Sequence, residues 1–363
     1  MIDFNGVIFG TCLFIASFMS GLRKPVIREL VGQSSSKVSM NNQECALIDF
    51  LLPSKDTEII QNLANDEIIA KSVAGGPCKK IYVNIQADES SSTSQVLNYM
   101  SKLYSTIWNE AALQSALDIE CYIVSDLLGQ EGTLTRKDIL LLPELRYFAT
   151  TGEESIEQFT KLRANANLPP VECTNVNATV QPLFDEYALQ PSITVLDAPH
   201  EQQPRDLPKF SVVALGGTFD KLHFGHCKLL TLASLCCTDT LLVGITSDSM
   251  LTKKSHASKI SPFAQRKNGV QNFLGNAKIS ERLKVDLIEI NDPFGPTVTN
   301  PDIDAIIVSS ETIRGAFKIN RIRAEKGMKR LHILVTYRTD PVVLSSTFIR
   351  ESKSRSVDGS LDS

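Results

Sequence analysis

The side chains best suited to chemistry in this chain lie together in the string GGTFDKLHFGH, Gly216–His226. Glycines let a backbone approach an anion closely, and histidines can donate hydrogen bonds to phosphate oxygens. His223 and His226 lie three positions apart, and Thr218 adds a hydroxyl and a backbone N–H group. The string therefore predicts a phosphate site, with two histidines that only cap a helix as the alternative.

The sequences on either side of the string predict the elements that position it. Ser211–Leu215 is an apolar run typical of a buried parallel strand, and leucines recur at helical spacing in Cys227–Leu235. The free N–H groups at a helix N-terminus point toward a bound anion. We therefore expect the turn and the helix start to hold phosphate together.

Strands and helices alternate along the C-terminal part of the chain, which is typical of an α/β, Rossmann-like, doubly wound parallel sheet. Ligands of such sheets bind at the carboxyl ends of the strands. The sequence of the N-terminal part also predicts an α/β domain, in which Ser192–Leu196 would be the last strand. This part of the chain contains no catalytic motif. The expected organisation is an apolar segment and polar link (1–40), an α/β domain of unassigned role (41–196), a linker (197–209), the doubly wound domain (210–352) and a disordered tail (353–363).

The Gly216–His226 string resembles the signature of the nucleotidyltransferase superfamily. The residues after it resemble phosphopantetheine adenylyltransferases of the eukaryotic and archaeal type, over about residues 210–352. The further segments of the resemblance are Leu242–Ile245, Lys253–Lys254, Lys259–Arg266, Asp292–Pro296, Val308–Gly315, Ile319–Arg323 and Leu344–Arg350. The resemblance implies transfer of the adenylyl group of ATP to 4′-phosphopantetheine, giving dephospho-coenzyme A and pyrophosphate.

The resemblance also implies roles for individual residues. His226 would contact the α-phosphate with His223 beside it, and Thr218 would bridge the two reacting phosphates. Lys254, with Lys253 as its rival, would clamp the reacting phosphate, and Arg314 would bind phosphate from the opposite wall. The other expected ATP contacts are Gly216, Gly217, Phe219, Ser345, Ser346 and Thr347, and the remaining candidates are Asp220 and Arg321.

Each of these residues also has a structural explanation. Asp220 could serve only as a turn cap, and the serines and threonine only as a helix cap. The Lys253–Lys254 pair could be a solvated surface. Arg314, Arg321 and Arg323 could form a surface ion-pair cluster, and Arg266 could pair with a carboxylate.

The reaction implied by the resemblance needs no basic or covalent residue, because a phosphate oxygen is already a nucleophile near neutral pH. Catalysis then reduces to positioning and to stabilising extra negative charge. We expect Mg²⁺ with ATP, held mainly by phosphate oxygens and water, and no metal site built by the protein.

Composition narrows the possible environments and partners. A net charge of −4 argues against a broad basic surface for nucleic acid. The cysteines are scattered without a CxxC pair, which favours reduced thiols and a cytoplasmic location. The apolar run Val7–Met19 is short for a bilayer span, and it leaves weak membrane association open.

Two rival functions remain at this point. One is a cytidylyltransferase, although Leu344–Arg350 favours the adenylyltransferase. The other is a non-catalytic scaffold that organises other coenzyme A enzymes, which are also possible partners of an active enzyme. The sequence contains no GxxxxGK[ST] phosphate loop, so we expect a monofunctional, fungal-like form without a fused kinase.

Overall fold

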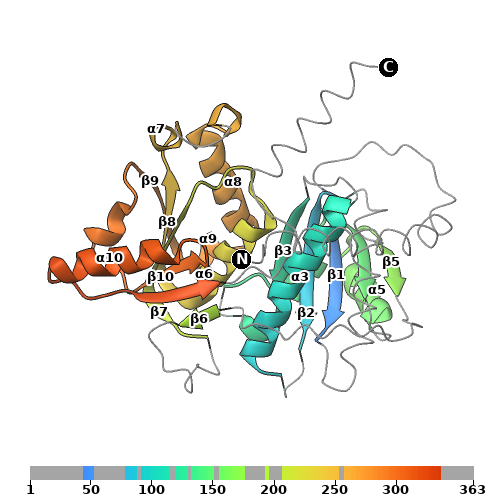
Figure 1. Ribbon diagram of the computed structural model, residues 1–363. Coiled ribbons are helices and arrows are strands. Elements are labelled where there is room, and N and C mark those ends of the chain that lie inside the picture. The colour runs from blue at the N-terminus through green and yellow to red at the C-terminus, as the bar shows by residue number, and fades with distance from the viewer. Residues whose placement is uncertain are drawn as a thin grey trace, which may run out of the picture. The chain divides into compact units, whose positions relative to one another are not determined.

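The computed structural model describes residues 44–52, 78–87, 91–113, 119–129, 132–150, 155–175, 193–195, 207–252 and 257–336. These residues form one five-stranded sheet and one six-stranded sheet with helices packed on them (Figure 1). Both sheets belong to one compact unit that begins at Asn42. The expected α/β class, with a doubly wound sheet in the C-terminal part, is confirmed.

The first sheet is entirely parallel, in the order β3-β2-β1-β4-β5. Its strands are β1 (Cys45–Leu51), β2 (Lys80–Gln86), β3 (Glu120–Val124), β4 (Leu145–Thr150) and β5 (Glu172–Asn175). Its helices are α3 (Thr93–Leu113), the 3-10 turn η1 (Asp126–Leu128), α4 (Arg136–Leu140) and α5 (Ser155–Asn165). A reciprocal pair caps α3, since the Gln95 N–H donates to Ser92 Oγ and the Ser92 N–H donates to Gln95 Oε1.

The second sheet has the order β6-β11-β10-β7-β8-β9. Its strands are β6 (Ile193–Val195), β7 (Phe210–Gly217), β8 (Cys237–Thr246), β9 (Lys284–Ile290), β10 (Ala305–Ser309) and β11 (His332–Thr336). Its helical segments are α6 (Phe224–Cys236), α7 (Asp248–Leu251), η3 (Ala257–Lys259), α8 (Phe263–Asn276), α9 (Ile279–Arg282), η4 (Gly295–Val298) and α10 (Ile313–Glu325).

One strand lies in a different sheet from the one that the sequence predicts. The segment Ser192–Leu196 was expected in the first domain, but its strand β6 pairs antiparallel with β11 at the edge of the second sheet. The apolar residues of a strand predict that one of its faces is buried. They do not predict which strand it pairs with, because pairing is made by backbone hydrogen bonds. The other strands of the second sheet pair in parallel.

The second sheet is covered on both faces, as a doubly wound sheet requires. Side chains alternate along β7, so that Val213 and Leu215 join the apolar cluster that includes α6, while Ala214 joins the cluster beneath α10. The chain runs outward from β7 to β8 and β9, then returns to β10 on the other side. The topological switch point therefore lies between β7 and β10, and their carboxyl ends are the expected binding edge.

Among the described helices, none combines the length and the apolar character that crossing a bilayer requires. The apolar segment Val7–Met19 lies outside the described residues.

Candidate active site

The turn after β7 begins with two glycines at the switch point. Gly216 pairs in register with Gly244 of β8, and Gly217 with Ile245. A Cβ at Gly217 would lie 3.2 Å from Cε2 of Phe219, closer than nine in ten real Cβ contacts. The Thr246 hydroxyl donates to the Gly217 carbonyl at 3.2 Å, which fixes the end of the strand. Glycine therefore allows the chain to turn sharply against a buried ring.

The backbone of this turn is strained at two non-glycine residues. Phe219 has φ 52° and Lys221 has φ 46°, both in the left-handed region that side chains disfavour. The Phe219 side chain is nearly fully buried. Such conformations persist where the surrounding structure holds them, and they concentrate at functional sites. The packing around the turn, which includes the buried Phe219 ring, therefore fixes its shape.

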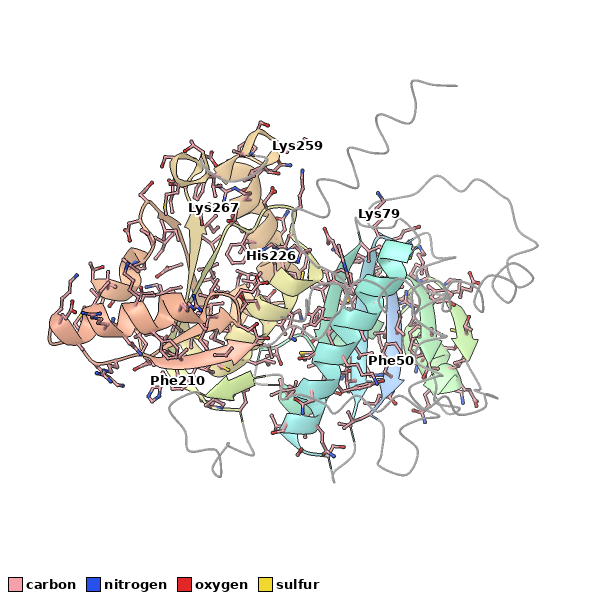
Figure 2. The ribbon with its side chains drawn as sticks, viewed as in Figure 1. Phe50, Lys79, Phe210, His226, Lys259 and Lys267 are labelled. Carbon is pink, nitrogen blue, oxygen red and sulfur yellow. The ribbon has the colours of Figure 1, made fainter. Side chains whose placement is uncertain are left out.

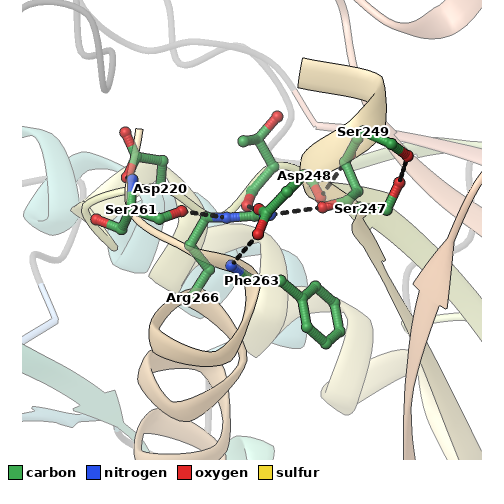
Figure 3. Close-up of polar contacts among 10 residues, drawn as sticks. Asp220, Ser247, Asp248, Ser249, Ser261, Phe263 and Arg266 are labelled. Carbon is green, nitrogen blue, oxygen red and sulfur yellow. Dashed lines mark hydrogen bonds and ion pairs between the residues drawn. The ribbon is translucent and has the colours of Figure 1, made fainter. Parts of the chain in front are cut away.

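A buried arginine on α8, Arg266, holds the turn and its neighbours, and Figure 3 shows its bonds to Ser261 and Asp248. The guanidinium of Arg266 has no exposed surface. It donates to three carbonyl oxygens, those of Ser261 at 2.8 Å, Thr218 at 2.7 Å and Thr246 at 2.7 Å. It also pairs with Asp248 Oδ1 at 2.7 Å, so the expected carboxylate partner is confirmed. Of these four hydrogen bonds, one ties α8 to the Gly216–His226 string, one to the end of β8 and one to the start of α7, and the fourth holds the segment before α8.

The carboxylates near this turn also bind backbone groups. Asp220 is fully buried, and its Oδ1 accepts the Ser261 N–H at 3.0 Å. Asp248 is exposed, and its pKa is lowered first by the Phe263 N–H, which donates to it at 3.1 Å, and then by Arg266. Asp220 therefore links the turn to the segment before α8, and Asp248 binds the first turn of α8.

The two histidines meet at the start of α6. His223 is the N-cap residue, and its N–H approaches Nδ1 of His226 at 3.4 Å. Their rings lie 3.8 Å apart between centroids with a tilt of 31°, and the Phe219 ring lies 5.2 Å from that of His226. His226 is half-buried on α6, where Figure 2 labels it, whereas His223 is buried. An Nδ1 that accepts places the proton of a neutral His226 on Nε2, the nitrogen that would then donate to an anion.

The helix α10 begins on the opposite face of the same sheet edge. It follows β10, and the Thr312 hydroxyl donates to the Ser309 carbonyl at 3.1 Å just before it. Arg314 lies exposed on its first turn. Helices α6 and α10 thus start on either side of the carboxyl ends of β7 and β10. An anion bound there would face two helix N-termini, two histidines and a cation.

The other arginines of α10 have separate structural roles. Arg321 is exposed and pairs with Glu325 at 3.1 Å, so its phosphate role stays a prediction. The alternative of a surface ion-pair cluster does not hold for Arg323, which is fully buried. Its guanidinium donates to the carbonyl oxygens of Thr297 at 2.7 Å and Asn300 at 2.8 Å, which it holds together. Charge alone predicts a surface position, but a guanidinium that satisfies several carbonyl groups can be buried.

The structure brings together only part of the expected site. Gly216, Gly217, Thr218, Phe219, Asp220, His223 and His226 form one turn and helix start, and Arg314 begins the helix across the sheet. Lys253, Lys254, Ser345, Ser346 and Thr347 lie outside the described residues. The bracing partners of Arg266 on β8 and before α8 were not predicted, because they depend on contacts between segments distant in sequence. The expected site roles stay predictions.

Residues 214–352 match a family described as cytidylyltransferase-like. A phosphopantetheine adenylyltransferase from Pyrobaculum aerophilum is 42% identical over 146 residues, which are 39% of this chain and 91% of that protein. One from Methanopyrus kandleri is 36% identical over 149 residues, 41% of this chain and 90% of its own. One from Saccharomyces cerevisiae is 40% identical over 132 residues, 36% of this chain, and the match spans only 43% of that relative's length. A solved structure of a protein with unknown function from Archaeoglobus fulgidus is 32% identical, with a TM-score of 0.31, and the match covers 35% of this chain and 99% of that one.

Proposed function

Because the chain belongs to the phosphopantetheine adenylyltransferase family, we propose that it transfers the adenylyl group of ATP to 4′-phosphopantetheine. The products are dephospho-coenzyme A and pyrophosphate, so the reaction is a step of coenzyme A synthesis. The observation that best supports this proposal is the close pair of His223 and His226 rings at the start of α6, directly after the glycine turn at the switch point. A cytoplasmic location and contacts with other coenzyme A enzymes stay predictions.

The reaction needs placement of two anions more than it needs proton transfer. A phosphate oxygen of 4′-phosphopantetheine attacks the α-phosphorus of ATP in line, and the bond from that phosphorus to pyrophosphate breaks. Charge increases on the α-phosphate oxygens as the bond order changes. Groups preorganised to donate hydrogen bonds there lower the barrier, because they need no rearrangement during reaction. A site with helix N-termini, imidazoles and an arginine fits this requirement.

Each residue then has a defined task in the proposed reaction. His226 donates from Nε2 to the α-phosphate, and the His223 ring supports the His226 ring through their close contact. Thr218 presents its hydroxyl and N–H to the reacting phosphates, while its carbonyl oxygen accepts a hydrogen bond from Arg266. Arg314 neutralises phosphate charge from α10. Lys254 or Lys253 would supply a further cation, and Ser345, Ser346 and Thr347 would bind the β- and γ-phosphates.

Magnesium enters this proposal as part of the MgATP substrate. Within the described part of the chain, no group of three or more histidine, cysteine or acidic side chains could hold a metal ion. Asp220, the carboxylate of the turn itself, accepts the Ser261 N–H and is buried. We expect the ion to be held mainly by phosphate oxygens and water, as Mg²⁺ usually is with nucleotides.

A kinetic comparison tests the proposal directly. Purified protein with Mg²⁺ and 4′-phosphopantetheine is offered ATP or CTP, and pyrophosphate release is followed. We expect release with ATP and little with CTP, and a His226→Ala variant that loses about 100-fold in kcat or more. Release with CTP alone would favour the cytidylyltransferase, and release with neither nucleotide from folded protein would favour the scaffold. An unchanged kcat in His226→Ala would refute the assigned role of His226.

A further inference from the structure

The helix that carries the histidines is packed between the two sheets. On one side α6 packs against β7, β8 and β10 of the second sheet. On its other side it packs against α3 and β3 of the first α/β region, and one apolar cluster includes residues from both regions. The first region, which has no catalytic motif of its own, therefore forms part of the surroundings of the histidine pair.

Two aromatic side chains of α3 make the contacts to α6. The Trp108 ring lies 5.5 Å from that of Phe224, edge to face, and 6.4 Å from that of His223. The Tyr104 hydroxyl and Thr231 Oγ1 form a hydrogen bond at 3.1 Å, and the Tyr104 ring lies 6.3 Å from that of Phe224. Phe224 is the first residue of α6 and His223 is its N-cap, so the aromatic contacts fall on the first turn of the helix.

The Trp108 ring fills space rather than making polar contacts. It is 1% exposed, and its indole N–H finds no hydrogen-bond partner among the described residues. Leaving a buried donor unsatisfied is unfavourable, so the contribution of this residue comes from its ring. Aromatic rings in edge-to-face contact have preferred distances and orientations, and they therefore fix the geometry of their neighbours.

We propose that Trp108 and Tyr104 are positioning residues for the histidine pair, and that the first α/β region thereby completes the nucleotide site. This inference rests on the proposed function, because it concerns the placement of His223 and His226 against the α-phosphate. A displacement of about 1 Å in a catalytic group can reduce the rate by about 100-fold. The glycine turn and Arg266 fix the Gly216–His226 string against the second sheet. Helix α3 packs against the start of α6 from the side of the first sheet.

Variants of α3 separate positioning from general stability. Trp108→Ala removes the ring, and we expect kcat to fall about 10-fold or more while KM for ATP changes by less than about 3-fold. Trp108→Phe keeps a ring and removes the unsatisfied N–H, so it should keep kcat within about 3-fold of the wild type. Leu97→Ala is the matched control, since Leu97 is also buried on α3 and lies about 16 Å along the helix from Trp108. It should lower the melting temperature and leave kcat nearly unchanged.

Trp108 is also the only tryptophan of the chain, so wild-type fluorescence reports on this contact without any variant. We expect a saturable change in tryptophan emission with MgATP, at the same midpoint that calorimetry gives for ATP binding. Bound ATP without any change in emission would overturn the proposal. Equal losses of kcat in Trp108→Ala and Leu97→Ala, or a wild-type kcat in Trp108→Ala, would also overturn it. A wild-type protein without turnover would instead refute the proposed function, and this inference with it.

Discussion

Arg266 donates a hydrogen bond from Nη1 to the carbonyl oxygen of Thr218 at 2.7 Å. This bond joins the first turns of α8 to the residue that follows the double glycine. The same guanidinium binds β8 through the Thr246 carbonyl, so the turn is fixed relative to the sheet beneath it. The turn that we propose as the phosphate site is therefore held by a buried guanidinium whose hydrogen bonds go to protein groups.

Replacing Arg266 should lower both the free energy of unfolding and kcat. In Arg266→Lys a single ammonium group replaces a planar guanidinium that donates hydrogen bonds to three carbonyl oxygens and a carboxylate. We expect a loss of about 3 kcal/mol in the free energy of unfolding and about a 10-fold lower kcat. Denaturant unfolding and steady-state kinetics measure the two effects. The control is Arg330→Lys at an exposed position, which should change neither. An Arg266→Lys variant as stable and active as the control would contradict the bracing role.

The glycine at the end of β7 should tolerate no side chain. In Gly217→Ala the new Cβ would lie 3.2 Å from the Phe219 ring, which is buried on a left-handed backbone and has little room to shift. We expect a loss of about 1–2 kcal/mol in stability and a higher KM for ATP. Gly269→Ala is the matched control, since nothing lies within 4 Å of a Cβ there and the residue is on α8.

Gly269→Ala should stabilise the protein by about 1 kcal/mol, because alanine is the better helix former. Chemical denaturation of both variants measures the contrast. If Gly217→Ala bound ATP and unfolded like the wild type, the close packing of the turn would be refuted.

The buried thiols should be unreactive in the folded protein. Burial raises the pKa of the Cys78 thiol to about 11 and that of Cys236 to about 12. At pH 8 a thiol with pKa near 11 is a thiolate only about one part in a thousand, and the thiolate is the reactive form. Iodoacetamide at pH 8 should therefore leave the peptides that contain Cys78 and Cys236 unmodified. Both should be labelled after unfolding in guanidinium, as peptide mapping by mass spectrometry would show. Labelling of either within minutes in the folded state would contradict the burial.

Local pattern was enough to predict the helix at the site. The leucines that recur at helical spacing in Cys227–Leu235 predict a helix, and α6 covers the whole of that segment. The apolar run Ser211–Leu215 predicts a strand, and it lies within β7. The Gly216–His226 string could also be identified as a candidate phosphate site, because its glycines and histidines lie within one continuous segment.

Contacts between distant segments could not be predicted in the same way. The Trp108 ring packs on Phe224 at the start of α6, more than a hundred positions further along the chain. The buried position of Arg323 depends on carbonyl groups of the η4 region that fold around it. Neither contact is encoded in a periodic pattern of neighbouring residues. Each forms only when the tertiary structure brings two distant segments together.

The most direct test of the proposed reaction follows oxygen atoms from substrate to product. The protein is given MgATP and 4′-phosphopantetheine whose phosphate carries ¹⁸O, and both products are analysed by mass spectrometry. Attack of the acceptor phosphate on the α-phosphorus predicts that all of the label appears in dephospho-coenzyme A and none in pyrophosphate. Label in the pyrophosphate, or an ATP turnover that leaves 4′-phosphopantetheine unchanged, would contradict adenylyl transfer to this acceptor.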